Sequence, residues 1–157
     1  MSLPISGGPP PPSHTPLPPD QVVPLARALM KTGRGAFAAN HLSELADSAG
    51  VPVSHAYVAA GMLPMVRFER EHEVVFVVCS GGCQSQGSLG ILEKLLETRD
   101  HRIEAGEPAF DVQTRGCLNG CSYAPLVEVQ TKEGVGHIPK ATFESVDEVL
   151  ETLAEER

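Results

Sequence analysis

Four cysteines in two matched pairs are the residues of this chain with the most specific chemistry. The first pair is Cys79 and Cys83, and the second is Cys117 and Cys121. Three residues separate the two thiols of each pair, and thirty-three residues separate the pairs. Thiolates are soft ligands that select zinc, copper or an iron–sulfur cluster over hard cations. Four of them on two glycine-bearing loops therefore predict a metal or iron–sulfur site.

The spacing of the cysteines favours some metal sites over others but does not identify the metal. Structural zinc knuckles commonly place two residues between their thiols, and the common ferredoxin patterns crowd several cysteines into one loop. Two separated pairs suit a two-iron cluster held between two loops. Zinc, a disulfide or dithiol redox pair, and unligated thiols remain alternatives, although a reducing compartment disfavours the disulfide.

Size and charge exclude several classes of protein. A chain of 157 residues with 41% hydrophobic residues can form one ordinary domain, or a small domain with a helical appendage. Its net charge is −8 and its basic residues do not cluster, so nucleic acid is not an expected partner. No apolar run approaches the roughly twenty residues that span a bilayer, and the N-terminus lacks a signal-peptide core. We expect a cytoplasmic protein without direct membrane insertion.

The elements that must position the cysteines follow from hydrophobic periodicity. A buried strand precedes each cysteine pair, a helix joins these two strands, and a hairpin and a capped helix follow. The predicted strands are 74–78, 110–114, 126–130 and 135–138, and the predicted helices are 88–98 and one that begins at a capping box of Ser145 and Glu148. The order β-α-β-β-β-α is compatible with a thioredoxin-like α/β domain over residues 69–157.

The remaining residues divide into two parts. Eight prolines within residues 1–19 predict an extended or disordered tail. Residues 20–68 predict a small helical bundle without cysteine. Its helices are expected from a cap at Asp20 to Lys31, over 38–49 with Gly50 as the stop, and over 54–63. A charged connector over 67–73 joins the bundle to the cysteine-bearing domain, and the histidines are expected at the surface.

With these motifs in place, the sequence resembles the thioredoxin-like [2Fe–2S] subunits of NADH-linked oxidoreductases. These include the small flavoprotein-fragment subunit of complex I and its relatives in NAD-linked hydrogenases and formate dehydrogenases. The resemblance covers residues 20 to about 154. It is carried by the two cysteine loops, 78–87 and 116–125, and by Gly50-Val51-Pro52 and Tyr57 in the helical part. Members usually have four residues between the first two cysteines, where this chain has three.

The resemblance implies a thioredoxin-like [2Fe–2S] ferredoxin domain preceded by a small helical bundle. It implies one [2Fe–2S] cluster with Cys79, Cys83, Cys117 and Cys121 as ligands, which would pass single electrons. The implied partner is a larger subunit with FMN and the NAD(H) site, where hydride transfer takes place, so no catalytic residue is expected in this chain. A stand-alone thioredoxin-like ferredoxin and a zinc-stabilised interaction module are the alternatives.

Overall fold

The computed structural model describes residues 16–32 and 35–155, and these form a mixed helical and sheet structure. Most of the predicted tail, residues 1–15, and part of the predicted break after the first helix, residues 33–34, lie outside the described residues. The helices are α1 (Pro19–Lys31), α2 (Ala39–Ala49), α3 (Val53–Gly61), α4 (Ser88–Glu104) and α5 (Phe143–Glu155). The strands are β1 (Ala36–Phe37), β2 (Arg67–Phe68), β3 (Val75–Cys79), β4 (Asp111–Arg115), β5 (Val127–Thr131) and β6 (Gly134–Ile138).

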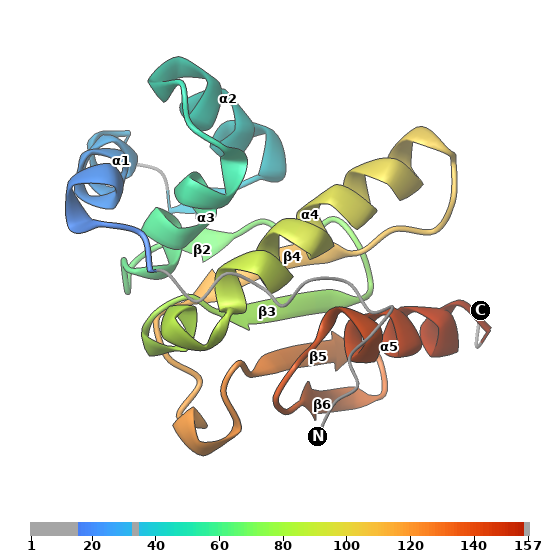
Figure 1. The fold of residues 1–157 in the computed structure, drawn as a ribbon. Coiled ribbons are helices and arrows are strands. Elements are labelled where there is room, and N and C mark those ends of the chain that lie inside the picture. Colours follow the sequence, from blue (N-terminus) through green and yellow to red (C-terminus); the bar gives the residue numbers. More distant parts are fainter. Residues whose placement is uncertain (1–15, 33–34, 156–157) are drawn as a thin grey trace.

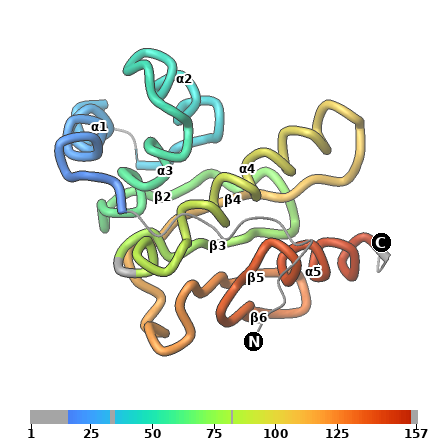
Figure 2. Tube along the Cα trace, viewed as in Figure 1, coloured from blue at the N-terminus to red at the C-terminus, as the bar shows by residue number. Residues whose placement is uncertain are grey.

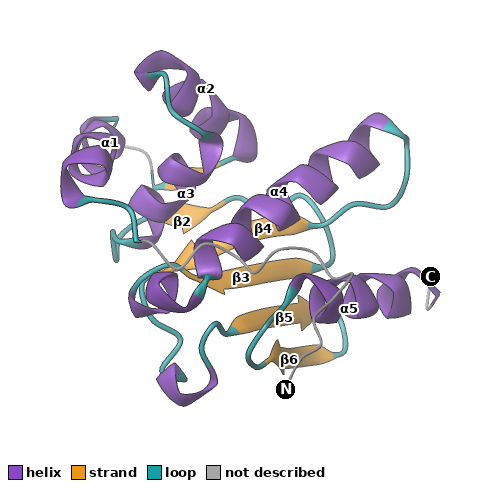
Figure 3. Cartoon of the chain, viewed as in Figure 1, coloured by secondary structure: helices purple, strands orange, loops and turns teal. Residues whose placement is uncertain are grey.

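A four-stranded sheet in the order β4-β3-β5-β6 forms the centre of the fold (Figures 1 and 3). β3 and β4 are parallel because α4 carries the chain back to the edge where β3 began. β5 is antiparallel to β3, and a tight turn returns β6 antiparallel to β5. The predicted order β-α-β-β-β-α is therefore confirmed from β3 to α5.

One hydrophobic core joins the sheet to all five helices. Side chains that share a face of the sheet, such as Phe76, Val112 and Val127, belong to the same buried cluster as residues of α1 to α5. Figure 1 shows α4 and α5 lying across one face of the sheet, with α1 to α3 gathered on the β4 side. No helix in the described part of the chain is long and apolar enough to cross a membrane.

Tyr57 of α3 attaches the helical part to the sheet and to α4. Its ring is 1% exposed and stacks on Phe68 with 5.9 Å between ring centroids. Its hydroxyl accepts a hydrogen bond of 2.8 Å from Nη1 of Arg99, and its backbone carbonyl accepts one from the Thr114 hydroxyl. Burial raises the pKa of Tyr57, so the phenol stays neutral and can serve the Arg99 guanidinium as an acceptor.

Several predicted helix ends are wrong in detail. α1 begins at Pro19 with Pro18 as its N-cap, so Asp20 lies in the first turn instead of capping the helix. Proline suits such a start, since its missing N–H would have no intrahelical partner there. α4 continues to Glu104, well beyond the predicted end at Thr98, although its last turns are largely exposed. Gly50 ends α2 in the left-handed conformation, with φ of 69°, as predicted.

The predicted capping box of the last helix is also wrong. The reciprocal pair is Thr142 and Ser145: the Thr142 hydroxyl accepts the Ser145 N–H at 3.0 Å, and the Ser145 hydroxyl accepts the Thr142 N–H at 2.8 Å. α5 therefore begins at Phe143, before the predicted start. The predicted charged connector over 67–73 also contains a strand. Its first two residues form β2, which pairs in parallel with β1.

Gly61, the last residue of α3, gives the first testable prediction. A Cβ atom there would lie 2.6 Å from the Ser80 hydroxyl oxygen and 2.9 Å from the Thr114 Cβ. Gly61→Ala should therefore lower the free energy of unfolding by about 1–3 kcal/mol through overpacking. Gly136→Ala is the matched control, because nothing lies within 4 Å of a Cβ at Gly136. Equal denaturation midpoints for the two variants would contradict the close contact.

Candidate metal centre

The parallel pairing of β3 and β4 brings the two cysteine loops to one edge of the sheet. Cys79 is the last residue of β3 and is in register with Arg115, the last residue of β4. Cys117 follows two residues later. Because parallel strands end at the same edge, the loop with Cys83 and the loop with Cys121 start side by side. Figure 2 shows the segments that follow β3 and β4 emerging at this common edge.

The two loops touch through their backbones. The Ser80 N–H donates a hydrogen bond of 2.8 Å to the Arg115 carbonyl. A Cβ at Gly81 would lie only 2.0 Å from the Gly116 carbonyl oxygen, so a side chain at this position would push the loops apart. The Cys79 sulfur lies 3.9 Å from the same carbonyl oxygen. Glycine at position 81 is thus required by the approach of the second loop.

Leu126 closes the site from a third segment, just before β5. Its carbonyl accepts the Cys79 N–H at 3.4 Å, and its own N–H donates to the Cys83 sulfur. A Cβ at Gly120 would lie 2.5 Å from a Leu126 methyl group, so the second cysteine loop rests on this side chain. Sequence reasoning treated Leu126 only as the start of a strand, since nothing in its type signals contact with both loops.

The two cysteine pairs differ sharply in exposure. Cys79 is 4% exposed and Cys83 is 3% exposed, whereas Cys117 and Cys121 are both exposed. Burial, together with the neighbouring Cys79 and Cys121 thiols, raises the pKa of Cys83 to about 11, although the Leu126 N–H offsets part of this rise. The Cys83 thiol is therefore protonated at neutral pH without a metal, and a binding metal must displace that proton.

The structure brings the predicted ligands together unequally. All four thiols are free, and Cys83 interacts with both Cys79 and Cys121. Cys117 instead contacts Asn119, whose N–H donates to the Cys117 sulfur at 3.2 Å from a left-handed backbone with φ of 59°. In the described residues, no three cysteine sulfurs lie within 4.8 Å of one another. Four soft donors on two touching loops fit a two-iron cluster by their chemistry.

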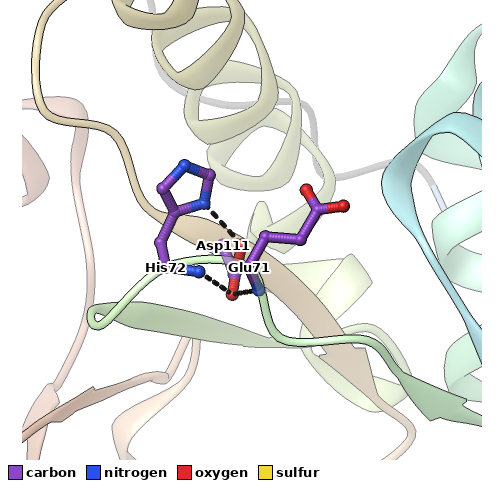
Figure 4. Close-up of side chains that lie close together, drawn as sticks. All are labelled: Glu71, His72 and Asp111. Atoms are coloured by element: carbon purple, nitrogen blue, oxygen red, sulfur yellow. Dashed lines mark hydrogen bonds and ion pairs between the residues drawn. The ribbon is translucent and has the colours of Figure 1, made fainter.

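A second group of possible metal ligands lies at the opposite end of β4. Atoms of Glu71, His72 and Asp111 lie within 4.8 Å of one another (Figure 4). One oxygen of the buried Asp111 carboxylate accepts the backbone N–H groups of Glu71 and His72 at 2.7 and 2.9 Å, and the other lies 2.7 Å from Nδ1 of His72. These bonds use both oxygens, so the carboxylate acts as a clamp that fastens the connector to β4. His72, expected at the surface, is half-buried in this clamp.

Comparison with known proteins gives one family and a related structure. A family model described as thioredoxin-like [2Fe-2S] ferredoxin matches residues 13–154. A similar solved structure is the wild-type thioredoxin-like [2Fe-2S] ferredoxin from Aquifex aeolicus, with 21% sequence identity and a TM-score of 0.45. The similar region covers 54% of this chain and 88% of that chain. No curated protein matches the sequence.

The difference in thiol exposure predicts an order of chemical modification. In metal-free protein at pH 8, iodoacetamide should alkylate Cys117 and Cys121 first and Cys83 last. Mass spectrometry of the digested peptides measures the rate at each cysteine. Each unit of pH up to about 11 should raise the Cys83 thiolate fraction, and its rate, about tenfold. Protein unfolded in guanidinium is the control, in which the four rates should converge. If Cys83 reacted fastest in the folded protein, this result would contradict the burial of its thiol.

Proposed function

The chain belongs to the thioredoxin-like [2Fe–2S] ferredoxin family, and we propose on that premise that Cys79, Cys83, Cys117 and Cys121 hold its cluster. Proteins of this family carry a [2Fe–2S] cluster, and the chain is an iron–sulfur electron carrier. When bound, such a cluster accepts and releases one electron at a time. The observation that carries the ligand set is the contact of two cysteine loops at Gly81 and Gly116.

The protein groups around the sulfurs set how easily an electron is accepted. The N–H groups of Asn119 and Leu126 donate to the sulfurs of Cys117 and Cys83. Hydrogen bonds to ligand sulfur stabilise the more electron-rich, reduced state and so raise the reduction potential. Burial of Cys79 and Cys83 removes water from one side and acts in the opposite direction, because the additional negative charge is then less well solvated.

Substitution of one proposed ligand tests the cluster site. Anaerobically purified wild-type protein should be coloured, with two iron and two sulfide per chain, as a [2Fe–2S] cluster requires. Cys117→Ser should lose or destabilise the cluster, seen as loss of visible absorption, while the circular dichroism of the helices is retained. Ser122→Ala is the matched control, because Ser122 is an exposed residue of the same loop.

Two results would overturn the cluster proposal. A colourless wild-type preparation with stoichiometric zinc and no iron or sulfide would establish the zinc alternative. Full cluster occupancy with an unchanged spectrum in Cys117→Ser would remove Cys117 from the ligand set.

We further propose that the protein exchanges electrons with a larger flavin-bearing subunit of an NAD(P)H-linked oxidoreductase. Hydride transfer from the nicotinamide takes place on that partner, and its flavin then passes electrons singly to this chain. The resemblance of both cysteine loops and of the helical part supports this context. The exposure of Cys117 and Cys121 supports it too, because a partner can approach the second cysteine pair directly.

A variant beside the exposed cysteines tests the partner proposal. Tyr123 follows Cys121 closely and is 57% exposed. Affinity capture of the wild-type chain from its native host at moderate salt should co-purify a flavoprotein, detected by flavin fluorescence. Tyr123→Asp should reduce the captured flavin several-fold, since it places a charge at the approach to the second pair. Val135 lies on β6 and is similarly exposed, at 61%, so Val135→Asp should leave the amount of captured flavin unchanged. Capture without any flavoprotein would favour a stand-alone ferredoxin.

A further inference from the structure

The side-chain amide of Gln84 joins the first cysteine loop to the segment that leads into α1. Gln84 follows Cys83 and is 9% exposed. Its Nε2 donates a hydrogen bond of 2.6 Å to the Ser80 carbonyl, between the two cysteines of the first pair. Its Oε1 accepts the Leu17 N–H at 2.8 Å. Two segments 67 positions apart in the chain thus meet on one buried side chain.

The bond to Ser80 controls the peptide next to the loop contact. The C=O and N–H groups of a trans peptide point in opposite directions. Holding the Ser80 carbonyl toward Gln84 therefore fixes the plane of the peptide between Ser80 and Gly81. Gly81 has no room to move toward the second loop, because the Gly116 carbonyl already occupies the space of a Cβ. Gln84 thereby fixes the backbone on which Cys79 and Cys83 are carried.

The bond to Leu17 fixes the start of the helical part. The Leu17 side chain packs against the hydrophobic core, and α1 begins two residues later at Pro19. The primary amide of Gln84 donates to Ser80 through its NH2 group and accepts from Leu17 through its oxygen. A carboxylate in its place keeps the acceptor and loses the donor, whereas a thioether of similar size loses the donor and nearly all of the acceptor strength.

We propose that Gln84 is a positioning residue for the cluster. It holds the Cys79–Cys83 loop in place through Ser80 and couples that loop to the segment before α1 through Leu17. The buried pair stays shielded from water as long as this bridge is intact. Displacement of the segment before α1 should therefore change the reduction potential of the cluster. This inference rests on the cluster ligation proposed above.

Full-length, cluster-loaded protein with the substitution Gln84→Met tests the bridge. The reduction potential, measured by spectroelectrochemical titration, should rise, because water admitted to the buried pair stabilises the more charged reduced state. Hydrogen exchange at the Leu17 amide should accelerate about tenfold or more. Gln86→Met is the matched control: Gln86 is exposed in the same short helix and should change neither measurement.

A second substitution separates the two ends of the bridge. When its carboxyl is ionised, Gln84→Glu keeps an acceptor for the Leu17 N–H and removes the donor to Ser80. The variant is therefore measured at alkaline pH, because burial favours the protonated carboxyl at lower pH. The Leu17 amide should stay protected, while the potential falls because a buried negative charge opposes reduction. Gln86→Glu adds the same charge in solvent and should shift the potential less. If Gln84→Met fails to fold or to load its cluster, Gln84→Glu tests the role of Gln84 in its place.

The outcomes separate this inference from the proposed function. Wild-type protein without iron would overturn both. Cluster-loaded Gln84→Met with the wild-type potential, electron paramagnetic resonance spectrum and Leu17 exchange rate would overturn the role of Gln84 and leave the electron-carrier function standing. Equal shifts in Gln84→Glu and Gln86→Glu would also overturn it, because position 84 would then have no special relation to the cysteines.

Discussion

Parallel pairing of β3 with β4 is the constraint on which the site depends. Its register places Cys79 opposite Arg115, so both cysteine loops leave the sheet at one edge. The α4 crossover makes this pairing possible, and the packing of α4 against the sheet keeps the register in place. A shift of one residue would turn Cys79 to the other face of the sheet and separate the first cysteine pair from the second.

The contact between the loops is built almost entirely from backbone. Gly81 meets the Gly116 carbonyl, and Ser80 donates to Arg115. Leu126 binds the first pair with its N–H and its carbonyl, and its side chain contacts the second loop at Gly120. Backbone contacts leave the sulfurs free for ligation and place N–H groups near them. The result is asymmetric, with one cysteine pair inside the protein and the other at the surface. A centre of this kind is shielded on one side and open to exchange on the other.

The helical part and the sheet share one core, so the cysteine loops are not isolated from the N-terminal half. Tyr57 contacts Phe68, Arg99 and Thr114, and thereby links α3 to α4 and β4. Gln84 links the segment before α1 to the loop between Cys79 and Cys83. Buried contacts therefore cross the predicted division between residues 68 and 69. Through them, a structural change in the helical part can alter the position of the first cysteine pair.

The sequence by itself determined the four thiols, the order of the elements from β3 to α5, and the end of α2 at Gly50, because periodicity, ligand chemistry and glycine conformation are local properties. It misplaced the start of α1, where Pro18 and not Asp20 precedes the helix. It also misplaced the cap of α5, where Thr142 and Ser145 are two polar residues that could each have capped the helix. Only the tertiary structure decided that Cys79 and Cys83 are buried while Cys117 and Cys121 are exposed, and that Leu126 and Gln84 hold the loops. Those properties depend on contacts between segments far apart in the chain, and no local pattern of residue types encodes which distant backbone will approach.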